Sequence, residues 1–141
     1  MHFSFSVIVQ RMINSTTAGI CYSQHPVSGD KNQFVIEAGF GLGDANEDRP
    51  FTPDTYTVKR DPIEILDKNI SIQNVEVITL GGSGTSMQDI EPSQGGKQKL
   101  SDELIKQLVE LVKEVEVAYG KPVMVEWVYA DEFYLVQARE L

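Results

Sequence analysis

The chain has 141 residues, 41% of them hydrophobic, so it can bury one modest core and form a single domain. It carries 12 Lys and Arg against 21 Asp and Glu, and this formal charge of -9 disfavours nucleic acid as a partner, because like charges repel. One cysteine excludes an internal disulfide, and no apolar run reaches the roughly 18 residues of a membrane-spanning helix. We therefore expect a soluble protein of the reducing cytoplasm.

The first half of the chain is expected to form short strands. The segments FSVIVQRM and AGICYSQ are rich in β-branched and aromatic residues and flank a polar turn at residues 14–16, which is typical of a hairpin. A third strand is expected at 33–38, before the glycines of GFGLGD, and shorter ones at 55–59, 63–66 and 75–80. Residues 81–99 are rich in Gly, Ser and Gln and lack apolar periodicity, which predicts a flexible internal loop.

The second half contains the clearest helix, over residues 102–119. Ser101 is a suitable N-cap, acidic residues occupy the first turn, and Gly120 with Pro122 ends the pattern. Its apolar side chains form a stripe wide enough to cover a sheet. Two last strands, at 123–129 and 132–138, are expected to pair antiparallel about a tight Ala130-Asp131 turn. These elements predict an α+β fold, with a mainly antiparallel sheet covered by one long helix.

Polar residues interrupt the last two apolar strands. Glu126 lies within VMVEWVY, and Gln137 and Arg139 lie within YLVQAR. Residues two apart in a strand share a face, so pairing about the turn brings the three side chains close together. A carboxylate and an amide oxygen suit Mg²⁺, and a guanidinium suits a phosphate group, so the trio is a candidate half of a Mg-nucleotide clamp. An ordinary cross-strand ion pair between Glu126 and Arg139, with Gln137 at the rim, fits the same spacing.

Six segments in a fixed order span nearly the whole chain: VIVQRM, AGICYSQHPVSGD, VIEAGFGLGD, TPD at 52–54, GKPVMVEW and FYLVQAR. In order and spacing they resemble the ATP-binding domain of the phosphoenolpyruvate synthase and pyruvate phosphate dikinase family, which rifampicin phosphotransferases share. Each segment alone is weakly specific, whereas six in register make chance implausible. The resemblance implies that residues 1–141 form one partial domain, the C-terminal subdomain of an ATP-grasp fold.

The resemblance also implies roles for particular residues. The backbone at Gln10 and Met12 would meet the adenine edge, and the carboxylates of Glu37 and Asp44 would line the same cleft. Asp44 stands where the family commonly has Glu, so its carboxylate would reach about one methylene less far, a gap that a water can bridge.

At the phosphate end, Glu126 and Gln137 match the residues that bind Mg²⁺ and ATP, and Arg139 matches the catalytic arginine that neutralises the transferring phosphoryl group. Met124 departs from the family, which usually has an acidic residue at this position. A thioether is a poor Mg²⁺ ligand, so one ligand of the clamp would be missing.

The function implied is the ATP-binding part of a pyruvate, water dikinase that transfers phosphate to a carrier histidine, in a gluconeogenic setting. The N-terminal ATP-grasp lobe and the phosphohistidine domain would be its partners, and the isolated chain would not be catalytically complete. A half-cleft leaves apolar surface, so self-association into a homo-oligomer is also expected. Two alternatives are a non-catalytic binding or assembly module and a fragment of a rifampicin phosphotransferase-like antibiotic kinase.

Overall fold

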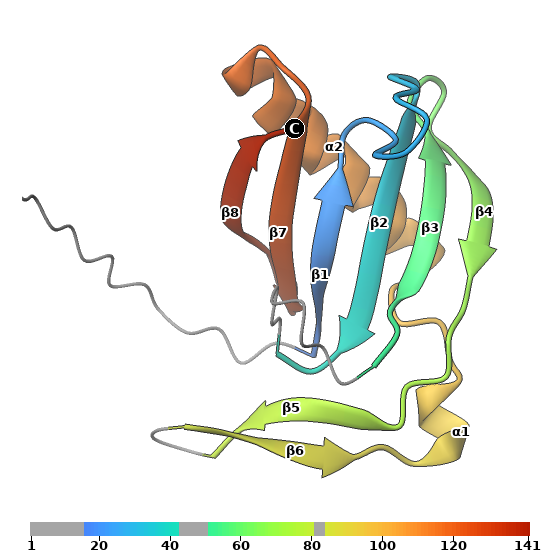
Figure 1. Cartoon of the computed structure of the whole chain (residues 1–141), viewed down its shortest axis with the longest axis vertical. Coiled ribbons are helices and arrows are strands. Elements are labelled where there is room, and N and C mark those ends of the chain that lie inside the picture. Colours follow the sequence, from blue (N-terminus) through green and yellow to red (C-terminus); the bar gives the residue numbers. More distant parts are fainter. Residues whose placement is uncertain (1–15, 43–50, 81–83) are drawn as a thin grey trace, which may run out of the picture.

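The computed structural model describes residues 16–42, 51–80 and 84–141. Its main sheet has six antiparallel strands in the order β4-β3-β2-β1-β7-β8. The strands are β1 (Thr17–Tyr22), β2 (Gln33–Phe40), β3 (Asp54–Lys59), β4 (Glu64–Asn69), β7 (Val123–Ala130) and β8 (Glu132–Glu140). The long helix α2 (Asp102–Tyr119) runs across one face of this sheet (Figure 1). The α+β prediction is confirmed.

The ends of α2 lie where the capping signals place them. Ser101 is the N-cap, and its side-chain oxygen accepts a hydrogen bond from the N–H of Leu104 at 3.3 Å. Gly120 ends the helix in the left-handed conformation, with a φ of 70°, and its N–H donates to the carbonyls of Glu116 and Val117. The helix therefore starts and stops at local signals that do not depend on the rest of the fold.

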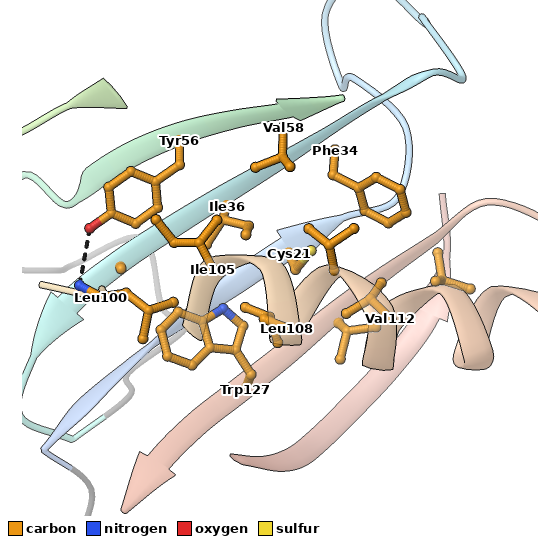
Figure 2. Packing of buried hydrophobic residues seen from close by; sticks show 14 residues of the cluster. Cys21, Phe34, Ile36, Tyr56, Val58, Leu100, Ile105, Leu108, Val112 and Trp127 are labelled. Atoms are coloured by element: carbon orange, nitrogen blue, oxygen red, sulfur yellow. Dashed lines mark hydrogen bonds between the residues drawn. The ribbon is translucent and has the colours of Figure 1, made fainter. Parts of the chain in front are cut away.

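The core lies between α2 and the sheet. Ile105, Leu108, Val109 and Val112 of the helix are fully buried. Figure 2 shows helix side chains pointing at aromatic and aliphatic side chains of the strands, with Trp127 beneath the first turns. Burial of such side chains contributes about 1.5–3 kcal/mol each before the entropy cost of ordering them is counted. The apolar stripe predicted for this helix is thus the one that holds it on the sheet.

A glycine at the centre of the sheet lets two strands and a tryptophan pack closely. A Cβ atom at Gly19 would overlap the carbonyl oxygen of Glu37 and lie 3.0 Å from the Trp127 ring. We therefore expect Gly19→Ala to lower the free energy of unfolding by about 3 kcal/mol or more, measured by urea denaturation, because backbone atoms of β1 and β2 must separate. In the matched control Gly96→Ala, the new methyl group has nothing nearer than 3.8 Å. Similar losses in the two variants would show that close packing at Gly19 is not the cause.

The segment 81–99, expected to be a flexible loop, contains a strand and a short helix within its described residues 84–99, which corrects the expectation of a loop there. Strand β6 (Thr85–Asp89) pairs with β5 (Val75–Thr79), and a one-turn helix, α1 (Pro92–Gly95), follows. This excursion lies beyond one end of the main sheet (Figure 1). Hydrogen bonds link it to the sheet, among them the bond from the N–H of Leu42 to the carbonyl of Val77, and such bonds leave no apolar periodicity in the sequence. Its flexibility stays a prediction.

Gln73 joins the excursion to the main sheet. It is fully buried, and its side-chain amide accepts from the N–H of Phe40 at 2.8 Å and donates to the carbonyls of Phe40 and Val75. Its own N–H donates to the carbonyl of Gly95 at 2.9 Å. The Gln73 side chain thus makes the hydrogen bonds to Phe40, at the end of β2, that a neighbouring strand would otherwise make. The strand expected at the start of the chain, FSVIVQRM, lies outside the described residues.

Candidate functional site

The candidate site lies on the face of the sheet opposite α2. Side chains alternate between faces along a strand, and the helix packs on the Val123, Val125 and Trp127 side of β7. Met124 and Glu126 therefore point to the other face. No helix of the described part of the chain covers that face in Figure 1. A ligand bound on this face would therefore be contacted by side chains of the strands and not by α2.

Strand register gathers three of the predicted residues in one row. Glu126 is the direct cross-strand neighbour of Gln137, and Ile20 of β1 is the neighbour of both Glu126 and Glu37. Directly opposed residues have Cβ atoms about 5 Å apart, and two strand spacings separate the carboxylate positions by about 10 Å. The row Glu37–Ile20–Glu126–Gln137, here called the polar row, thus joins residues far apart in sequence.

A β-bulge in the last hairpin brings Gln137 into the polar row. Trp127 pairs with Leu135, whereas the preceding residue of β7, Glu126, pairs with Gln137, so β8 has one extra residue, Val136. Without this bulge, Val136 would face Glu126 and Gln137 would point toward the helix side of the sheet. The sequence predicted that Glu126 and Gln137 lie close together, but not the β-bulge that pairs them.

Arg139 lies beside the polar row and pairs with Met124. A guanidinium nitrogen, Nη2, lies 3.6 Å from the Met124 sulfur, and Met124 is buried at 8% exposure. Among the ion pairs of the described residues, none joins Arg139 to Glu126. A thioether neutralises no charge, so the arginine keeps its positive charge beside the row. The cross-strand ion pair that the spacing also allowed is not formed.

The donor set near Glu126 fits part of a Mg²⁺ site. The described residues contain no cluster of three His, Cys, Asp or Glu side chains that could hold a metal. Glu126 and Gln137 together offer two oxygen ligands, and Mg²⁺ is commonly bound through one or two carboxylates with waters and substrate phosphates completing the shell. Gln10, Met12 and Asp44 lie outside the described residues, so their roles stay predictions.

Asp54 and Lys99 form a buried ion pair that sequence reasoning missed. Their side chains are fully buried, with Lys99 Nζ and Asp54 Oδ1 3.0 Å apart. Asp54 also accepts from the Tyr56 hydroxyl at 2.7 Å and from the N–H groups of Ser71 and Lys99. Burial, together with the hydrogen bond to Asp54, raises the pKa of the Tyr56 phenol, which stays protonated and donates. The only sequence signal for Asp54 was the TPD segment, which contributed to the family resemblance. The role of Asp54 is structural, because its buried carboxylate pairs with Lys99.

Comparisons with known proteins identify the family. The profile described as "Pyruvate phosphate dikinase, AMP/ATP-binding domain" matches residues 1–141. The chain belongs to this family. A probable phosphoenolpyruvate synthase of Archaeoglobus fulgidus is 38% identical over 98% of the chain, and one of Methanocaldococcus jannaschii is 34% identical over 99%. A rifampicin phosphotransferase of Bacillus subtilis is 35% identical over 96%. The resemblance inferred from the six segments is confirmed.

The chain is much shorter than the relatives that it matches. The chain spans 12% to 18% of the length of those three relatives. It is therefore the counterpart of one small part of a pyruvate phosphate dikinase-type protein, an AMP/ATP-binding domain. No helix among the described residues combines the length and the apolar character needed to cross a membrane.

Proposed function

We propose that this chain binds Mg-ATP across the polar row and serves as the nucleotide-binding part of a phosphoenolpyruvate synthase-type phosphotransferase. The observation that supports this most directly is the meeting of Glu37, Glu126 and Gln137 on one face, with an arginine beside them that forms no ion pair with Glu126. In the full protein, the phosphoryl group would pass to a carrier histidine on another domain. The finer setting, cytoplasmic and gluconeogenic, stays a prediction, as does self-association.

Each residue has a distinct task in this proposal. Glu126 and Gln137 would hold Mg²⁺, which when bound neutralises the charge on the nucleotide phosphates. Arg139 would donate two N–H groups to the oxygens of the transferring phosphoryl group. The apolar side chain of Ile20, only 7% exposed, keeps the two carboxylates apart, so Glu37 is expected to act on a different part of the nucleotide.

The isolated chain is expected to bind nucleotide weakly. The relatives are much longer, and the second lobe that would close over the phosphates is expected elsewhere in such a protein. Met124 supports the alternative of a non-catalytic binding module, because a thioether occupies the place where a further carboxylate would help to hold the metal. The rifampicin phosphotransferase relative supports the other alternative, that the domain is part of an antibiotic kinase.

The test is a titration of the ¹⁵N-labelled chain with Mg-ATP, followed by NMR. We expect amide shifts at residues 10–12, 126, 137 and 139, and a several-fold loss of affinity when Mg²⁺ is removed. Glu126→Gln should abolish that Mg²⁺ dependence, because the carboxylate that binds the metal is lost.

Glu110→Gln is the matched control, since Glu110 is exposed on α2, which packs on the other face of the sheet. It removes the same charge and should leave binding unchanged. Shifts confined to residues outside the polar row and its neighbours would place the nucleotide elsewhere and refute the proposal.

A further inference from the structure

A cavity lies away from the polar row, at the end of the sheet where β1 ends and β7 begins. Its volume is about 510 Å³, within the range of roughly 300–1,000 Å³ typical of small-molecule sites. It is bounded by the segments after β1 and before β2, by Arg60 after β3, and by the C-terminal turn of α2. The polar side chains that line it include Gln24, Lys31, Asn32, Arg60, Glu116 and Lys121.

The charge of this lining is opposite to that of the whole chain. Lys31, Arg60 and Lys121 face one carboxylate, Glu116, whereas the chain as a whole carries -9. Arg60 Nη1 and Nη2 bind the two oxygens of Glu116 at 2.9 and 3.0 Å. Burial alone would raise the pKa of Glu116, but hydrogen bonds from Arg60 and Ser23 outweigh it and lower the pKa. The carboxylate is therefore ionised at neutral pH, and Arg60 cancels its charge.

The two lysines carry charge that the cavity does not neutralise. Lys31 is exposed, and no ion pair or side-chain hydrogen bond is found for it among the described residues. Lys121 has one partner, Glu140 at 3.4 Å, which does not belong to the lining and forms a largely exposed pair. Such exposed pairs are weak, so a better anion can replace Glu140.

Several contacts hold the Arg60 side chain in place at the edge of the cavity. Its Nε donates to the carbonyl of Lys31 at 2.9 Å, its Nη2 donates to the carbonyl of Ser23 at 2.9 Å, and its guanidinium stacks 4.7 Å from the centre of the Phe34 ring. With the two bonds to Glu116, these contacts use four of the five N–H donors of the guanidinium. One donor on Nη1 remains for a ligand, and the contact with Lys31 holds the backbone of that lysine in place.

We propose that this cavity, here called the anion pocket, binds a small polar molecule through a phosphate or carboxylate group. Lys31 and Lys121 would attract the anionic group, and the free N–H of Arg60 would orient it through a hydrogen bond. The side-chain amides of Gln24 and Asn32 would contact the rest of the molecule. The pocket is independent of the proposed nucleotide site, because none of the residues in the polar row lines it.

Inorganic phosphate is the first probe, titrated into the ¹⁵N-labelled chain at constant ionic strength with chloride as the balancing anion. We expect saturable shifts at the amides of Lys31, Asn32 and Lys121. The double variant Lys31→Gln/Lys121→Gln should weaken binding by about five- to tenfold, the combined effect of two exposed charge contacts. A carboxylate probe, succinate, then tests whether the pocket prefers phosphate.

Two control variants test whether phosphate binds in the anion pocket itself. Lys97→Gln/Lys106→Gln removes two exposed lysines that do not line the pocket, and it should leave the affinity unchanged. Glu126→Gln should also leave it unchanged. An equal loss in the first control would mean that phosphate responds only to net charge, and a change in the second would place phosphate at the polar row. Either result, or an absence of shifts at residues 31 and 121, would overturn the proposal.

Discussion

Lys99→Met is expected to lower the free energy of unfolding by about 3–5 kcal/mol, because the substitution leaves the Asp54 carboxylate buried without its counter-charge. Lys99 Nζ also donates to the carbonyls of Ser71 and Gly95, and these acceptors lose a donor as well. The change is a large fraction of the roughly 5–15 kcal/mol that stabilises an ordinary domain. Urea denaturation followed by tryptophan fluorescence measures it, since Trp127 lies in the core.

Lys97→Met is the matched control, two residues away on the exposed surface, and it should change stability by less than about 0.5 kcal/mol. Adding Asp54→Asn to Lys99→Met should recover part of the loss, because the unpaired buried charge is removed. A loss below about 1 kcal/mol for Lys99→Met would show that the pair contributes no more than an exposed one. The structural importance assigned to it would then be wrong.

Arg139→Ala is expected to reduce phosphoryl transfer by about a thousandfold or more, once the chain is fused to the N-terminal lobe of a phosphoenolpyruvate synthase and supplied with that protein's phosphohistidine domain as the acceptor. The loss should fall mainly on the rate and less on ATP affinity, because the guanidinium is proposed to meet charge that develops in the transition state. Single-turnover transfer of label from the phosphates of ATP to the carrier histidine of that domain, compared with ATP binding by calorimetry, separates the two effects.

Arg139→Lys is the informative partner, since it keeps the charge but loses the two-pronged donor geometry. We expect it to restore binding of the nucleotide more fully than the rate. A fusion that binds Mg-ATP but transfers nothing even with Arg139 intact would favour the non-catalytic module. Equal activity of the wild type and Arg139→Ala would exclude a catalytic role for the arginine.

Local signals made much of the fold readable from the sequence. Ser101 and Gly120 end the long helix through contacts within their own turns, and the helical stripe marks the buried face. Eight of the expected strands and helices, those at 18–24, 33–38, 55–59, 63–66, 75–80, 102–119, 123–129 and 132–138, have counterparts in the structure. Each of these has a periodicity or a cap that can be recognised without knowing its neighbours.

Features that depend on distant pairing could not be read in the same way. The ion pair of Asp54 and Lys99 joins residues 45 positions apart, and a lysine in a polar segment gives no sign that it will be buried. Strand β6 and helix α1 are likewise held by hydrogen bonds to Gln73 and its surroundings. The polar row was anticipated at Glu126 and Gln137, whereas the alignment of Glu37 with them depends on three strand registers.

The bulge at Val136 also limits how this domain can diverge over evolution. Loss of the bulge without a change in chain length would restore regular pairing in the last hairpin and turn Gln137 away from Glu126, while the apolar character of β8 would hardly change. Substitutions at the polar row can accumulate one at a time, but an insertion or deletion in β7 or β8 away from the bulge changes the facing of several residues together. Length variation among descendants of this domain is therefore expected in the connections between strands, and strict length conservation from Val123 to Arg139.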